Sequence, residues 1–172
     1  MIDKTYNVLF LCTGNSARSV MAESLLNHFG KGRFRAYSAG SHPTGRVHPL
    51  TLETLASAGL PTEGLRSKSW DELALPDAPT MDLVFTVCDR AAGEVCPVWP
   101  GQPVTAHWGF DDPAACAGPP DRCRAAFKRV FTEIQSRIQL LVNLPIEALD
   151  RLALKRELER IGKIASPSGV LR

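Results

Sequence analysis

The chain has 172 residues, the length of one compact domain with a sizeable core, and its apolar share of 44% and charged share of 22% are ordinary for a globular protein. A formal net charge of +2 is too small for a general nucleic-acid or membrane-surface binder, so any preference for anions must come from a local site. No apolar run approaches the roughly 18 residues of a membrane span, and the N-terminus lacks a secretory signal pattern. We therefore expect a cytoplasmic protein with no nucleic-acid or membrane partner.

Five cysteines, an odd number, fit poorly to a fixed framework of extracellular disulfides. In a reducing cytosol, cysteines in this number suggest metal binding or redox chemistry. No Cys-x2-Cys pair is present and the four histidines show no ligand spacing with the cysteines, which disfavours a zinc site. Redox or nucleophilic chemistry is the remaining interpretation. The cysteines are Cys12, Cys88, Cys96, Cys116 and Cys123.

Apolar patterning predicts strands that alternate with helices. The predicted strands cover 8–11, 34–38, 82–87 and 104–107. Helices are predicted from about Val20 to Gly30, from Pro49 to Gly59, from an N-cap at Asp121 to Pro145, and through Leu154, Leu158 and Ile161 to about Ile164. This alternation implies parallel pairing through right-handed crossovers, hence an α/β fold with a small doubly wound sheet and helices on both faces.

Polar and sulfur-containing side chains follow the predicted strands. Cys12, Cys88 and the loop after His107 each come at the carboxyl end of a strand. Ligands bind at these ends in an open parallel sheet. We therefore expect the three segments to share one site.

The segment 12–19 lies between a predicted strand and a predicted helix, and it has the pattern Cys-x5-Arg-Ser. Backbone N–H groups of such a loop, with the helix N-terminus behind them, form a cradle for a tetrahedral anion. Gly14 permits tight curvature because it can take a positive φ, and Arg18 supplies a fork of donors for two anion oxygens. The predicted anion-binding residues are Thr13, Gly14, Asn15, Ser16, Ala17, Arg18 and Ser19.

Cys12 faces the same positive field, which lowers the pKa of its thiol and makes a nucleophilic thiolate available near neutral pH. A loop serine, Ser16 or Ser19, is placed to donate a hydrogen bond to that thiolate. The pattern Cys-x5-Arg alone is weak evidence for an anion site, because it arises often by chance. The alternative is an unreactive buried cysteine beside a surface arginine. The flanking strand and helix favour the catalytic interpretation.

Several separate blocks of the sequence resemble the low-molecular-weight tyrosine phosphatase superfamily, and specifically its arsenate reductase branch, over about 8–138. These blocks are Cys12-Thr13-Gly14-Asn15-Ser16-Ala17-Arg18-Ser19, Tyr37-Ser38-Ala39-Gly40, Val87-Cys88, Cys96-Pro97 and His107-Trp108-Gly109-Phe110-Asp111-Asp112-Pro113. The resemblance implies a flavodoxin-like sheet of four parallel strands and the reduction of arsenate to arsenite in arsenic detoxification, with phosphate or sulfate as arsenate analogues. It implies a reductase domain at 1–144 and a helical extension at 145–172 that packs on or beside it.

The resemblance also implies catalytic roles. Asp112 occupies the general-acid position and Asp111 is the weaker candidate, while a solvated Asp-Pro turn is the alternative interpretation. Cys12 would attack arsenate, Cys88 would attack the Cys12 sulfur as arsenite leaves, and Cys96 would take over the disulfide by exchange with Cys88. The alternative makes Cys88 a small buried residue and Cys96 an incidental loop residue.

Two departures from the family concern the electron donor. Seven residues separate Cys88 from Cys96, where thioredoxin-linked members have six, and Ala17 stands where some relatives carry an extra cysteine. Thioredoxin is the first expectation because two further cysteines are suitably placed. Glutathione with glutaredoxin is the alternative, since it could resolve a Cys12 adduct directly. No tightly bound cofactor is expected.

Two further features carry expectations. Cys116 and Cys123 flank a Pro-rich turn and are predicted to be unreactive thiols near a helix start. Some relatives bind potassium beside the anion loop, and hard oxygen ligands would suit it. By likeness that site would map here to Asn15, Glu23, Ser38 and Asp71, although Ser38 and Asp71 are equally ordinary turn and cap residues.

The main rival function is a phosphatase for phosphotyrosine or a small phosphoester, with the same Cys12, Arg18 and Asp112 and a phosphocysteine intermediate. Tyrosine phosphatases of this family usually place Tyr after Asp-Pro, whereas Ala114 follows here. A second rival is a redox sensor or phosphocysteine carrier that signals to a partner. The helix beyond Pro145 would then offer a docking face.

Overall fold

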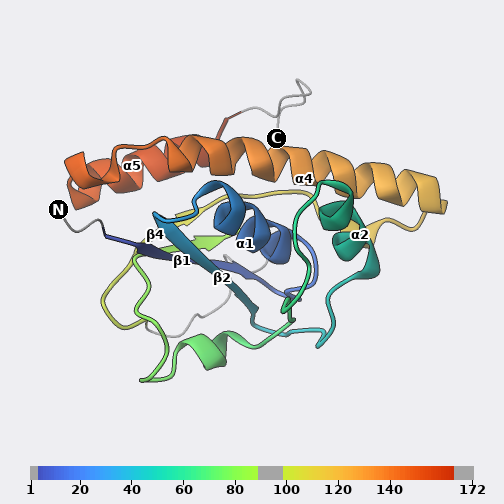
Figure 1. Cartoon of the computed structure of the whole chain (residues 1–172), viewed down its shortest axis with the longest axis horizontal. Coiled ribbons are helices and arrows are strands. Elements are labelled where there is room, and N and C mark those ends of the chain that lie inside the picture. The colour runs from blue at the N-terminus through green and yellow to red at the C-terminus, as the bar shows by residue number, and fades with distance from the viewer. Residues whose placement is uncertain (1–3, 89–98, 165–172) are drawn as a thin grey trace.

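A four-stranded parallel sheet forms the centre of the structure, a computed structural model that describes residues 4–88 and 99–164 (Figure 1). The strands lie in the order β2-β1-β3-β4. They are β1 Tyr6–Cys12, β2 Phe34–Gly40, β3 Leu83–Thr86 and β4 Val104–His107. The four predicted strands are thus confirmed to within two residues at each end. Strands β2 and β3 pair with opposite edges of β1, so the connections after β1 and after β2 run in opposite directions across the sheet. In such a sheet a crevice opens at the carboxyl ends of β1 and β3, where the order switches.

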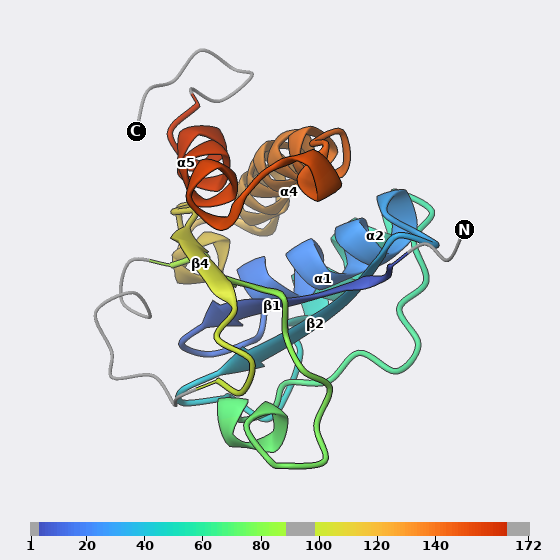
Figure 2. The same ribbon diagram turned by 90° about the vertical axis from the view of Figure 1, so that its left-hand side faces the viewer.

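Helices cover the sheet unequally (Figure 2). The α-helices are α1 Arg18–Phe29, α2 Pro49–Ser57, α4 Pro120–Val142 and α5 Arg151–Gly162, and the short 3-10 helices are η1 Trp70–Leu73, η2 Pro113–Ala115 and η3 Ile146–Ala148. The four α-helices share one face, and among the described residues the helix on the other face is η1. Pro119, rather than the predicted Asp121, is the N-cap of α4, because Pro120 suits the first helical position.

The alternation of side chains along β1 divides the core into two layers. Val8 and Phe10 face the α-helices, whereas Leu9 and Leu11 face the layer that contains η1 and Trp99. All four β1 side chains are fully buried. This burial on both faces explains why the strand is a continuous apolar run rather than an alternating one.

The last helix belongs to the larger core layer. Leu154, Leu158 and Ile161 of α5 are buried in the same apolar cluster as the strands. Trp108, which follows β4 and is fully buried, donates a hydrogen bond from Nε1 to the Leu158 carbonyl at 2.9 Å. Every helix within the described ranges is too short or too polar to span a lipid bilayer.

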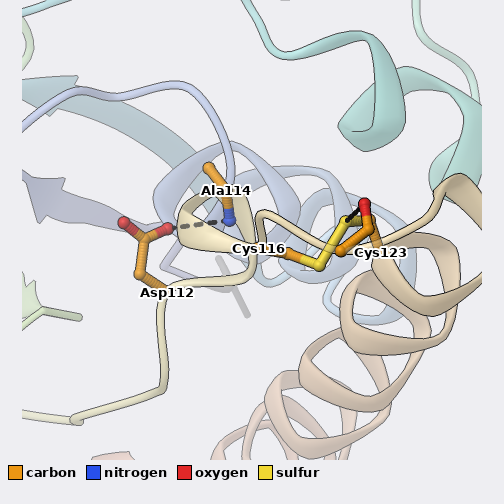
Figure 3. Close-up of a disulfide and its surroundings, with 5 residues drawn as sticks. Asp112, Ala114, Cys116 and Cys123 are labelled. Carbon is orange, nitrogen blue, oxygen red and sulfur yellow. Dashed lines mark hydrogen bonds between the residues drawn. A yellow bond between two sulfur atoms is a disulfide. The ribbon is translucent and has the colours of Figure 1, made fainter.

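A disulfide joins Cys116 to Cys123, with a Cα–Cα distance of 5.6 Å (Figure 3). The expectation of two unreactive thiols is therefore wrong. Cys116 is the C-cap of η2 and Cys123 lies in the first turn of α4. Of the two consecutive prolines between them, Pro119 is the N-cap of α4 and Pro120 is its first residue. The crosslink ties the segment after β4 to the start of α4.

Replacing Cys116 with Ser should lower the free energy of unfolding by about 2.5 kcal/mol, because closing a short loop removes entropy from the unfolded chain. The measurement is urea unfolding with and without dithiothreitol, in a background where Cys12, Cys88 and Cys96 are Ser. The reductant should destabilise the parent chain and leave the Cys116→Ser chain unchanged. A parent chain that is insensitive to reductant would contradict the crosslink.

Candidate active site

The anion loop, residues 12–18, runs from the end of β1 into α1 and lines a cavity of about 580 Å³. Strand register brings the second cysteine to the same place. Leu11 is level with Thr86 on β3, so Cys88 follows only one residue beyond the level of Cys12. The cavity is lined by residues 12–18, Thr44, Cys88, Phe110, Asp111, Asp112 and Ala114. The three strand-end segments expected to meet therefore do meet.

Hydrogen bonds from outside the anion loop hold three of its carbonyl groups. His42 N donates to Thr13 O at 2.9 Å, and the Ser67 hydroxyl donates to Gly14 O at 3.0 Å. Ser16 O accepts from the Thr51 hydroxyl at 2.7 Å and from His48 N at 3.0 Å. With these carbonyls drawn outward, the loop N–H groups are left to face the cavity, as anion binding requires.

Asn15, not Gly14, takes the left-handed backbone conformation in the anion loop, with φ of 48°. The expectation that Gly14 provides this freedom is wrong, and a Cβ on Gly14 would make only ordinary contacts. The Asn15 side chain is fully buried, and its Nδ2 donates to Ser19 Oγ at 2.8 Å and to Ser38 Oγ at 3.0 Å. Its Oδ1 accepts from Lys68 N at 2.9 Å, so the side chain compensates the strained backbone.

Gly40 is a site residue that sequence reasoning missed. It pairs with Cys12 at the end of β2, and a Cβ built there would lie 3.0 Å from Cys12 O and closer still to Thr13 O. Only glycine leaves room for the anion loop to pass at this distance. Gly40 is the last residue of the block Tyr37-Ser38-Ala39-Gly40 that carries the family resemblance, and this position is the sequence signal that could have identified it.

Arg18, the first residue of α1, lies across the mouth of the anion loop. Its Nη1 donates to Phe110 O at 3.0 Å, and its Nη2 is 3.5 Å from Asp112 Oδ2. Its Nε is buried and has no hydrogen-bond partner within the described ranges. Nε is therefore a donor that the described residues do not use, and the role of the guanidinium as a fork for two anion oxygens stays a prediction.

Asp111 and Asp112 both line the cavity, and Asp112 forms an ion pair with Arg18. Asp112 also caps η2, its Oδ1 accepting from Ala114 N at 3.0 Å (Figure 3). The Asp111 carboxylate instead faces Arg129 on α4 at 3.9 Å. Asp112 is therefore the better placed of the two for a general acid.

Cys12 and Cys88 are adjacent buried residues, and neither is in a disulfide. The hydrogen bond to the Cys88 sulfur, followed by burial, holds the pKa of the Cys12 thiol above its ordinary value, although the Arg18 guanidinium acts in the opposite direction. The expectation of a lowered pKa is thus not met in this arrangement, because the neighbouring sulfur and burial outweigh the guanidinium. The Thr13 hydroxyl lies 3.7 Å from Cys88 Sγ. The third predicted relay residue, Cys96, lies outside the described residues.

The oxygen ligands that family likeness suggested for potassium are only partly brought together. Ser38 Oγ donates to Glu23 Oε1 at 2.5 Å and accepts from Asn15, so three of the four side chains bond directly to one another. Burial raises the pKa of the Glu23 carboxyl, and the Lys68 charge offsets part of this effect. Asp71 is exposed on η1. The potassium site that family likeness suggested stays a prediction.

Comparison with known proteins agrees with this geometry. Over 132 residues the chain is 39% identical to an arsenate reductase of Halalkalibacterium halodurans, and the match covers 77% of this chain and 91% of that one. A solved arsenate reductase of Archaeoglobus fulgidus superimposes with a TM-score of 0.63 at 34% identity, covering 80% of this chain and 99% of that one. A thioredoxin-dependent arsenate reductase of Corynebacterium glutamicum, at 28% identity and a TM-score of 0.54, covers 82% and 65%.

The sequence profile of one protein family matches residues 7–157, which include the anion loop, part of α5 and the segment 108–112 between β4 and η2, which we call the acid loop. The matched region contains both strand-end cysteines and the crevice between them. The chain therefore belongs to the low molecular weight phosphotyrosine protein phosphatase family.

Proposed function

We propose that this protein reduces arsenate to arsenite, with Cys12 as the nucleophile and Cys88 as the first reductant. The single observation that carries the proposal is that two buried, free thiols, Cys12 and Cys88, line the same anion cavity. Hydrolysis of a phosphoester needs one cysteine, an arginine and an acid. A second thiol beside the nucleophile is what a two-electron reduction adds.

The first step forms a bond between Cys12 and arsenic. Arsenate binds in the anion loop with Arg18 Nε and the loop N–H groups as donors, and the Cys12 thiolate attacks arsenic. An arsenate oxygen leaves as water after Asp112 protonates it. Arsenic remains in the pentavalent state, so no electrons have yet been transferred.

The second step transfers the electron pair. The Cys88 thiolate attacks the Cys12 sulfur, a sulfur–sulfur bond forms and the sulfur–arsenic bond breaks with its electrons kept by arsenic, which leaves as arsenite. Cys96 then attacks Cys88, releasing Cys12 as a thiol. The Cys88–Cys96 disulfide is reduced by an external dithiol, for which we propose thioredoxin in the cytoplasm, with glutathione and glutaredoxin as the alternative.

The Cys12 thiol must lose its proton before it attacks arsenate. The Cys88 sulfur and burial raise the pKa of Cys12 and so oppose this loss, whereas the Arg18 guanidinium lowers that pKa and favours it. Once Cys12 is bonded to arsenic, Cys88 must release its own proton to solvent or to the departing group before it attacks the Cys12 sulfur.

Arsenite production from arsenate, with thioredoxin, thioredoxin reductase and NADPH, tests the proposed relay. Cys12→Ser, Cys88→Ser and Cys96→Ser should each abolish turnover, while Cys116→Ser should retain it. Glutathione with glutaredoxin serves as the parallel donor. Turnover that survives without Cys88 would reject the relay, and hydrolysis of p-nitrophenyl phosphate without any arsenite would assign the protein to the phosphatases.

The pH dependence of Cys12 alkylation by iodoacetamide tests whether Cys88 raises the pKa of the Cys12 thiol. In a Cys96→Ser background, Cys88→Ala should move the pH midpoint of alkylation downward by about one unit, because the main cause that raises the pKa of Cys12 is removed. Arg18→Met should move the midpoint upward, because the guanidinium lowers that pKa. Mass spectrometry identifies the alkylated site. Midpoints that coincide in all three proteins would show that the sulfurs titrate independently.

Replacing Asp112 with Asn should lower kcat for arsenate reduction by about 10²-fold, the usual cost of losing a general acid. The matched control is Asp111→Asn, which should change kcat by less than about threefold because that carboxylate faces Arg129. Steady-state arsenite production measures both. Equal losses in the two variants would argue that the acid loop acts through its overall charge instead.

A further inference from the structure

The last turn of α5 lies directly against the end of β4, where the acid loop begins (Figure 2). A Cβ built on Gly162 would lie 2.7 Å from His107 O and 2.7 Å from Trp108 Cδ1. Trp108 is also tied to α5 through its hydrogen bond to Leu158 O. The helix and the start of the acid loop are therefore in contact through backbone as well as side chains.

Arg137 of α4 binds the carboxyl end of α5. Arg137 is 3% exposed, and its guanidinium donates from Nε to Ile161 O at 3.2 Å and from Nη2 to Ile164 O at 2.8 Å. These carbonyls are at the end of α5, where a helix leaves acceptors without internal partners and favours a cation. The charge of Arg137 thus fixes where the last turn of α5 lies.

The same guanidinium covers the ring of Phe110, with 4.7 Å between its central carbon and the ring centroid. Phe110 is buried, and its carbonyl accepts the hydrogen bond from Arg18 Nη1. One edge of Arg18 is held by this carbonyl, which leaves Nε for the anion. A shift of Phe110 would release that edge and let the Arg18 guanidinium turn away.

We infer that Arg137 of α4 is a positioning residue for the oxyanion site: it joins the end of α5 to Phe110, and Phe110 in turn holds Arg18. The inference rests on the anion-binding part of the proposed function and not on its redox steps. Phe110 lines the anion cavity and is in contact with the Arg137 guanidinium. The inferred route from Arg137 to the anion therefore runs through the position of Phe110.

Phosphate binding, measured as protection of Cys12 from iodoacetamide, tests the inference without requiring turnover. Arg137→Met should weaken phosphate binding by about tenfold, a usual size for coupling between sites. Arg137→Lys should weaken it less, because an ammonium keeps the charge over the ring but does not span both carbonyls. Gly162→Ala, which leaves Arg137 in place and displaces α5, should also weaken binding.

The matched control is Leu141→Ala, a buried residue one turn further along α4. It should lower the melting temperature at least as much as Arg137→Met while changing phosphate binding by less than twofold. In an Arg18→Lys background, Arg137→Met should add less than twofold, because its route to the anion is already lost.

Three results would overturn the inference: unchanged phosphate binding in Arg137→Met, an equal loss in Leu141→Ala, or full additivity with Arg18→Lys. A wild-type chain that binds phosphate but produces no arsenite would reject the proposed reduction and leave this test intact. The two failures are therefore distinguishable.

Discussion

The carbonyl groups of an anion-binding loop must point away from the anion, and in this protein other segments of the chain hold them there. Donors from 42–51 and from Ser67 bind the carbonyls of Thr13, Gly14 and Ser16. A carbonyl turned into the cavity would repel an oxyanion and remove a donor at the same time. The anion site therefore depends on the long connection after β2 as much as on its own residues, and Gly40 is where that connection must let the loop pass.

Strands, helices and the anion loop could be predicted because each is set by residues close in sequence. Apolar runs and helix periodicity defined the elements, and Cys-x5-Arg between a strand and a helix defined the loop. What could not be predicted depends on contacts between distant residues. The positive φ of Asn15 follows from hydrogen bonds to Ser38 and Lys68, and the crosslink at Cys116 requires knowing how η2 meets α4.

The pKa of Cys12 shows why a correct motif can still give a wrong electrostatic expectation. From the loop alone, Arg18 and the helix N-terminus predict a lowered pKa. The structure adds burial and the neighbouring Cys88 sulfur, both of which raise the pKa of the Cys12 thiol against the effect of the guanidinium. A raised pKa also protects the thiol, because a thiol is less readily oxidised than a thiolate.

The two halves of the site have different mechanical requirements. On one side the acid loop must keep Asp112 and Phe110 in fixed relation to Arg18, and it is held by α5, by Arg137 and by the disulfide at Cys116. On the other side, the proposed relay has Cys88 attack Cys12 and then be attacked by Cys96. These two steps require different orientations of the Cys88 sulfur, since each has its own in-line geometry. Rigidity on the acid side would therefore let Cys88 change position during the proposed reaction without disturbing the donors of the anion site.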